Sequence, residues 1–146
     1  MAAETGAFCT EGLQYIMEAA FSEEQTPPAN FYVLLVTDAA VAVGQNLAGL
    51  TELSGNGYAR VAVASNDTDL TGATDGAAGW QLTTKEVTFT ADGGAWSTAK
   101  HACLATTTDD AGKLIGYMEI NGATGWTLAD GQHIDIAMVL IQPVPA

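Results

Sequence analysis

The chain has 146 residues, of which 48% are hydrophobic, and its 17 acidic and four basic side chains give a formal net charge of −13. A chain of this length and hydrophobic content predicts one folded domain over residues 1–146. Four cations are too few for the basic surface that binds nucleic acid or anionic lipid, and no segment approaches 18 consecutive apolar residues. We therefore expect neither a nucleic-acid nor a membrane partner.

The first predicted element is a helix over about residues 10–21. Thr10 is the expected N-cap, and Glu11 suits the positive end of a helix dipole. The polar run after residue 21 and the prolines at 27–28 should end the helix. We expect its apolar stripe to pack on a sheet, because a helix this short needs a partner surface. The stripe consists of Leu13, Ile16, Met17, Ala20 and Phe21.

A continuous apolar run at residues 31–36 predicts a central strand that is buried on both faces. A long connection over residues 38–56 follows, in which we expect a helical turn within 46–53. A strand is predicted at 58–64. Residues 65–79 are polar and glycine-rich, so they predict an irregular loop.

The rest of the chain predicts further short strands separated by turn residues. They lie at residues 86–90, 101–107, 114–120 and 134–141, with short edge strands near 80–82 and 126–128. In the first of these, Val87 and Phe89 are expected to point inward and the residues between and around them outward. Turn signals recur at roughly ten-residue spacing, which is typical of a β-sandwich. Strands do not alternate with helices, so a parallel sheet is disfavoured. The predicted fold is mainly β, an antiparallel jelly-roll-like β-sandwich with one N-terminal α-helix.

Two histidines could contribute to a metal site. His101 and Cys103 share one strand face, and His133 and Asp135 share another. Zinc needs three or four converging ligands, and this spacing matches no known zinc motif. We therefore expect no metal and no cofactor, and we expect Cys9 and Cys103 to be small buried thiols.

Asp67 and Asp69 resemble the first half of a calcium loop. The twelfth position of such a loop would hold a carboxylate, and Ala78 stands there instead. A solvated loop and a loose surface cation site both remain open. The sequence also holds no Gly-x-Ser-x-Gly nucleophile elbow and no phosphate-binding loop, so we expect no enzyme activity.

Trp80, Trp96 and Trp126 each lie in turn-rich sequence beside small residues. Tryptophans in such places either cap the core or form an interface, for example a platform for carbohydrate or protein. Both interpretations remain open for each of the three.

The segment from Glu52 to Val63 contains a turn, the start of a strand and the only arginine of the chain. Gly55 and Gly57 can supply the positive φ angles of a tight turn. Arg60 is expected to pair with a carboxylate. We predict Gly55, Gly57, Tyr58 and Arg60 as the structural anchor of this corner.

The order of these segments resembles a group of small virion structural proteins of tailed bacteriophages. The group is marked by a Gly-x-Gly-Tyr-x-Arg segment followed by a turn that bears a tryptophan. The matching segments here are Glu52–Arg60, Val87–Phe89, Gly94–Trp96, Lys100–Leu104 and Asp130–Gly131. The long connection at 38–50 and the strong acidity depart from the pattern.

The resemblance implies a capsid decoration, or cement, protein on the outer face of the head, assembled in the host cytoplasm. Its expected partners are the major capsid protein and further copies of itself, as a homo-oligomer, most simply a trimer. Residues 38–56 and the N-terminal residues would contact the lattice. The alternative is a tail or fibre component that binds a receptor or a glycan.

Overall fold

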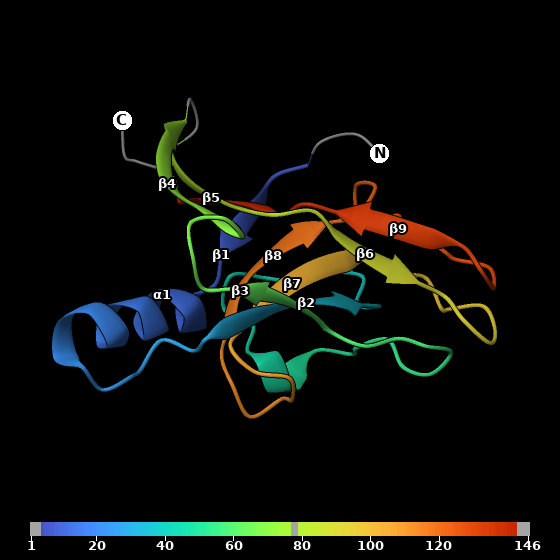
Figure 1. Ribbon diagram of the computed structural model, residues 1–146, viewed down its shortest axis with the longest axis horizontal. Coiled ribbons are helices and arrows are strands. Elements are labelled where there is room, and N and C mark those ends of the chain that lie inside the picture. The colour runs from blue at the N-terminus through green and yellow to red at the C-terminus, as the bar shows by residue number, and fades with distance from the viewer. Residues whose placement is uncertain (1–3, 77–78, 143–146) are drawn as a thin grey trace.

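The structure is a computed structural model that describes residues 4–76 and 79–142 (Figure 1). It confirms a mainly β fold with one short α-helix near the N-terminus. The elements are β1 (Gly6–Phe8), α1 (Thr10–Met17), the π-helical turn η1 (Glu18–Ser22), β2 (Asn30–Val36), the 3₁₀ turn η2 (Leu47–Gly49), β3 (Val61–Ala64), β4 (Leu70–Gly76), β5 (Gly79–Thr84), β6 (Val87–Thr90), β7 (His101–Ala105), β8 (Leu114–Glu119), β9 (His133–Ile136) and β10 (Val139–Gln142).

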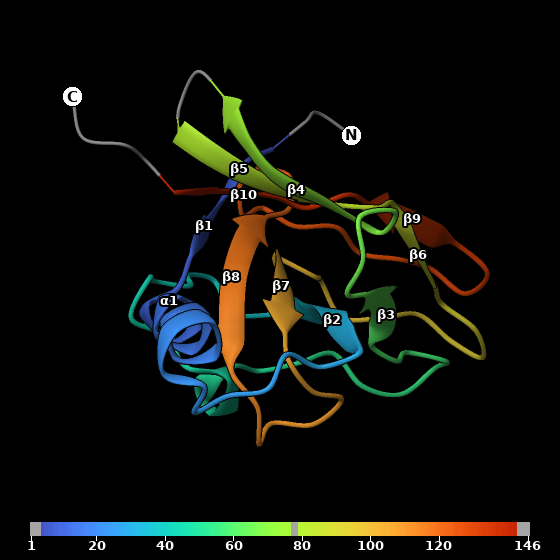
Figure 2. The same cartoon turned by 60° about the vertical axis from the view of Figure 1, so that its left-hand side comes forward.

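Eight strands form one curled sheet in the order β3-β2-β7-β8-β1-β10-β5-β4, and β6 and β9 form a separate two-stranded ribbon. Figure 2 shows β10, β5 and β4 crossing over the end of β8. The pairings among the described strands are antiparallel, as predicted, with one exception. β1 runs parallel to β10, with Gly6 opposite Leu140 and Ala7 opposite Ile141.

The larger core cluster joins the eight-stranded sheet to the β6–β9 ribbon. Val87 and Phe89 of β6 and Ile134 and Ile136 of β9 point into it, and their neighbours on each strand are exposed. This alternation is what a ribbon with one solvated face requires, and it confirms the inward positions predicted for β6.

The central strand β2 is buried on both faces, as its continuous apolar run predicted. Val33 and Leu35 belong to the larger cluster, whereas Leu34 and Val36 belong to a second cluster with Leu47 of η2. The long connection after β2 therefore covers the second face of the sheet, and its expected helical turn is η2.

The predicted burial of the helix stripe is wrong. Ile16, Met17 and Phe21 are 41%, 56% and 85% exposed, and Gly12 and Tyr15 face the protein instead. Glycine at position 12 explains this rotation. A Cβ at position 12 would lie 2.3 Å from the carbonyl oxygen of Ile115. The absence of a side chain thus lets the helix backbone lie directly against β8.

The predicted N-cap is also wrong by one residue. Cys9 holds the extended N-cap conformation and makes no side-chain capping bond, while Thr10 is the first helical residue. The helix ends close to the predicted position because η1 continues α1 to Ser22.

Two further segments differ from the prediction. Residues 65–79 were expected to form a loop, but Leu70–Gly76 is strand β4, an edge strand that pairs with β5 through an irregular register between Thr71 and Thr74. The predicted loop also includes residues 77–78, which lie outside the described residues. The β-branched threonines of this segment suit an edge strand in spite of its polarity.

The strand predicted at 134–141 is divided between the two sheets. β9 pairs with β6, and β10 pairs with β5 and β1. The buried Thr84 supports the break, because its hydroxyl accepts a hydrogen bond from the Met138 N–H at 2.9 Å. The segment near 126–128 contributes only an isolated bridge between Trp126 and Ala99, and the strand predicted at 58–64 begins at Val61.

Candidate functional site

The turn Gly55-Asn56-Gly57 places three successive residues in the left-handed region, with φ angles of 76°, 49° and 78°. The carbonyl oxygen of Asn56 accepts hydrogen bonds from the Asp92 N–H and the Trp96 indole N–H, both at 2.9 Å. The Asn56 side chain donates to the Ala95 carbonyl at 2.8 Å. The turn is therefore fixed against the loop that follows β6.

Tyr58 connects this turn to the central strand. Its hydroxyl accepts a hydrogen bond from the Leu35 N–H at 2.9 Å and donates one to Glu52 at 2.7 Å. Its ring stacks on Phe89 and meets the edge of Trp96, with centroids 6.1 Å and 5.5 Å apart. Burial raises the pKa of Tyr58, and the neighbouring Glu52 raises it further, so the hydroxyl remains a donor.

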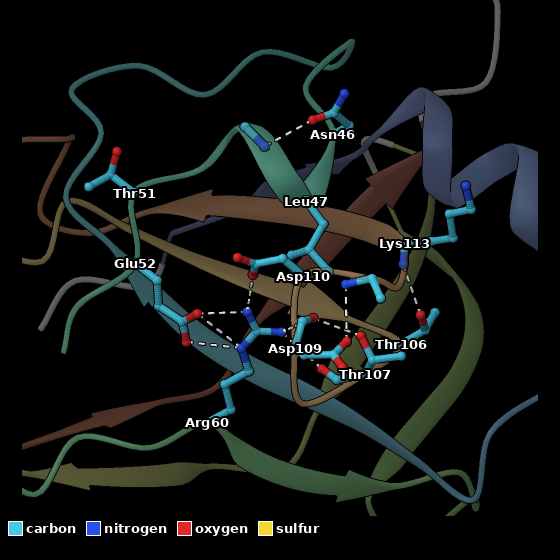
Figure 3. Close-up of polar contacts among 12 residues, drawn as sticks. Asn46, Leu47, Thr51, Glu52, Arg60, Thr106, Thr107, Asp109, Asp110 and Lys113 are labelled. Atoms are coloured by element: carbon cyan, nitrogen blue, oxygen red, sulfur yellow. Dashed lines mark hydrogen bonds and ion pairs between the residues drawn. The ribbon is translucent and has the colours of Figure 1, made fainter.

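Arg60 is the centre of a polar cluster at the surface (Figure 3). Its side chain is only 5% exposed, and its Nη2 atom lies 2.6 Å from Glu52 and 2.7 Å from Asp110. Nη1 donates to the carbonyl oxygens of Thr107 and Asp109 at 3.0 Å and 2.7 Å. Burial alone would lower the pKa of Arg60, but the hydrogen bonds and charges of Glu52 and Asp110 raise it. One carboxylate partner was expected for Arg60, and the structure provides two, Glu52 and Asp110.

The Arg60 cluster, formed by Glu52, Tyr58, Arg60 and the turn at 107–110, joins two segments that are far apart in the sequence. Tyr58 also connects the cluster to β2. The contact of this turn with Arg60 could not be predicted from the sequence, because the turn contributes mainly backbone carbonyl oxygens. The four anchor residues predicted from the sequence do lie in or beside this cluster. Their contacts are those of a structural support.

Glu11 forms a second long-range polar contact that sequence reasoning assigned only to the helix dipole. Its Oε2 atom accepts hydrogen bonds from the Leu47 N–H at 3.1 Å and the Leu114 N–H at 2.8 Å. Its Oε1 atom lies 3.6 Å from the Lys113 ammonium. Glu11 therefore joins α1 to η2 and β8.

The residues considered for zinc do not form a ligand set. His101 is buried, with Nδ1 2.9 Å from the Asp38 carbonyl oxygen, whereas His133 is exposed and lies 3.7 Å from Asp135. Across residues 4–76 and 79–142, no group of three or more His, Cys, Asp and Glu residues could hold a metal ion. Cys103 is buried, and burial raises its pKa well above the ordinary value.

Asp69 serves the fold. Its carboxylate lies 2.7 Å from the Lys85 ammonium and accepts a hydrogen bond from the Ala64 N–H at 2.8 Å. The hydrogen bond from Lys85 is the main reason that the pKa of Asp69 is lowered. Ala78, the twelfth position of the suggested calcium loop, lies outside the described residues.

The three tryptophans divide between the two interpretations. Trp96 is 5% exposed and packs in the larger core, whereas Trp80 and Trp126 are 49% and 45% exposed. Trp126 lines a shallow surface pocket of about 200 Å³ together with His133, Ile134 and Asp135. The structure thus leaves two of the three tryptophan side chains available for contacts.

A family model described as "Podophage GP4 fiber I protein gp80" matches residues 11–141. The chain belongs to this family. It is therefore a phage virion structural protein, as the order of its motifs indicated. No curated protein matches the chain.

The family match begins at the helix and continues to β10, so it includes the Arg60 cluster and both exposed tryptophans. β1 precedes the matched residues. None of the helices in the described parts of this family member is long and apolar enough to cross a membrane.

Proposed function

We propose that this chain is a structural subunit of a fibre on a podophage virion. The family match is the observation that carries the proposal, because a family described as a podophage fiber protein matches 11–141 of 146 residues. The resemblance seen in the sequence implies a capsid decoration protein first, with a tail or fibre component as the alternative. The family description favours the second of these.

The interior of the protein has features that favour a rigid fold, as a fibre subunit requires. β2 is buried on both faces, and the Arg60 cluster fixes the turn at 107–110 to the corner that follows η2. The Arg60 side chain is buried, so a shift of the turn would leave its guanidinium group without partners, and this holds the backbone in one arrangement. A rigid subunit of this kind can position contact surfaces at a distance from the particle.

We further propose the Trp126 pocket as a contact for a receptor or glycan. Trp126 offers an apolar ring face, and the exposed His133 and Asp135 side chains beside it can exchange hydrogen bonds with hydroxyl groups. A Trp126→Ala variant should lower the adsorption of virions to host cells, and Trp80→Ala is the matched control at the other exposed tryptophan.

The fibre assignment is tested on purified virions. Quantitative mass spectrometry should count far fewer copies of this chain than of the major capsid protein, and gold-labelled antibodies should mark fibres in electron micrographs. Copies that approach the number of capsid subunits, with gold over the whole head, would replace the fibre proposal by the decoration protein.

Self-association remains part of the proposal. We expect a homo-oligomer, most simply a trimer, because virion proteins are commonly arranged around a symmetry axis. Size-exclusion chromatography with light scattering of the purified chain measures this directly, and a monomer at all concentrations would rule it out.

A further inference from the structure

The outer face of the helix is the main apolar feature that the fold leaves unpartnered. Met17 and Phe21 are about one helical turn apart, and Ile16 precedes Met17 in the sequence; all three side chains are exposed. We call Ile16, Met17 and Phe21 the helix patch. Figure 1 shows α1 at the side of the molecule away from the β6–β9 ribbon. Single exposed apolar residues are ordinary, but three large ones within six residues of one helical segment indicate an interaction site.

Acidic residues surround the end of this helix. Glu18, Glu23 and Glu24 lie within and just after η1, and the exposed Glu23 has the left-handed C-cap conformation with φ 56°. The C-terminal end of a helix carries partial negative charge, so acidic side chains there are unfavourable. The last turn of this helical segment holds no basic residue that would relieve them.

A second copy of the chain is poorly suited to cover the helix patch. Three of its four basic side chains are already paired with carboxylates of their own chain: Arg60 with Glu52 and Asp110, Lys85 with Asp69, and Lys113 with Glu11. Two copies that met symmetrically at the helix patch would also bring Glu18, Glu23 and Glu24 of one copy close to the same residues of the other. Like charges in a contact oppose association.

We propose that the helix patch docks into an apolar socket, rimmed by lysine and arginine side chains, on a different protein of the virion. Phe21 is the central anchor, because it is 85% exposed and a large aromatic side chain contributes most when it fills a pocket. The basic rim neutralises Glu23 and Glu24 and so relieves the unfavourable charge at the helix end. This inference rests on the virion role of the chain, and it holds for a partner in the fibre, the tail or the head.

Photo-crosslinking in assembled particles identifies the occupant. Virions carrying the variant Phe21→p-benzoylphenylalanine should yield a crosslink to a different virion protein, at an apolar peptide flanked by lysine or arginine. The same substitution at Trp80 is the matched control, because that aromatic side chain is exposed on β5. A crosslink only to a second copy, no crosslink, or the same crosslinked peptide from position 80 would overturn the proposal.

Rebinding measures the two parts of the contact separately. Purified chain is added to virions assembled without it, and retention is measured after sedimentation. Phe21→Ser should weaken retention at least about tenfold, as the loss of a central anchor does, while leaving thermal unfolding unchanged. The double variant Glu23→Lys/Glu24→Lys should also weaken retention. Undiminished retention of either variant would overturn the proposal.

The crosslink and the gold labelling can fail independently. Gold over the head with a crosslink from position 21 to a capsid protein would reject the fibre location and retain the docking contact. Gold on fibres with no crosslink to a different protein would retain the fibre location and reject the docking contact.

Discussion

Removal of the Arg60 side chain should destabilise the protein more than the loss of any other basic side chain. Arg60→Ala leaves the carbonyl oxygens of Thr107 and Asp109 without their donors and the Glu52 carboxylate without its cation. Breaking a buried ion pair from one side costs about 3–5 kcal/mol. Glu52 and Asp110 are 23% and 63% exposed, so water compensates in part. We expect the lower end of that range, about 3 kcal/mol.

The free energy of unfolding is measured by urea denaturation and the melting temperature by circular dichroism. For a chain of this size, about 3 kcal/mol corresponds to a decrease of about 6–12 °C in melting temperature. Lys113→Ala is the matched control, because its ion pair with Glu11 is 3.6 Å long and the lysine is 43% exposed. Exposed pairs contribute at most about 1 kcal/mol.

Arg60→Lys separates charge from geometry. Lysine keeps the positive charge but lacks the planar fork that reaches Glu52, Asp110 and the two carbonyl oxygens together, so we expect an intermediate loss. An Arg60→Ala protein that unfolds within about 1 kcal/mol of the wild type, or no earlier than Lys113→Ala, would refute the reasoning that the cluster stabilises the fold.

Three further predictions concern the helix, acid stability and the thiols. Gly12→Ala should cost about 1–3 kcal/mol in urea denaturation, because the added Cβ would overlap the β8 backbone and force the helix outward; an unchanged midpoint would contradict this close approach. The pKa of Asp69 is lowered from its ordinary 3.8 in the folded state, so in acid the unfolded state binds more protons and the stabilisation from the pair with Lys85 is lost as the pH falls below about 4. Asp69→Asn should therefore flatten the dependence of the unfolding free energy on pH in this range. An unaltered slope would count against a stabilising role for the pair. Burial, with Glu11 nearby, raises the pKa of Cys9 to about 12, and burial also raises the pKa of Cys103. A thiol reagent at pH 8 should therefore label neither cysteine until urea unfolds the chain. Rapid labelling of the native protein would contradict the burial of these thiols.

The sequence predicted those features that depend on local periodicity. Val87 and Phe89 alternate with polar residues and face the core, and the apolar run of β2 is buried on both faces. In these strands the apolar side chains are the ones that face the core, so the pattern of burial could be predicted from the pattern of apolar residues.

Features that depend on distant partners were predicted less well. The apolar stripe with Ile16 and Phe21 has the spacing of a buried helix face, but the contact of Gly12 with the β8 backbone decided which face packs. Hydrophobic periodicity considers only the positions of apolar side chains. It cannot detect that a glycine allows the helix backbone to pack closely against a strand. The division of the last strand at Met138 likewise depends on Thr84, which lies 54 residues earlier in the chain.

Only part of the Arg60 cluster, the carboxylate partner, was predicted from the sequence. A lone arginine in an acidic chain was expected to find a carboxylate, and Glu52 lies close enough in sequence to be a candidate. The carbonyl oxygens of Thr107 and Asp109 could not have been inferred, because every residue carries a carbonyl and side-chain identity does not mark the ones that an arginine will reach.

The position of β1 has a consequence for biosynthesis. This strand is synthesised before the other elements of the structure, yet its neighbours in the sheet are β8 and β10, which are synthesised after most of them. During translation β1 stays without its partners, with its backbone groups bonded to water, until β8 and β10 have left the ribosome. Closure of the sheet is then a late and long-range step.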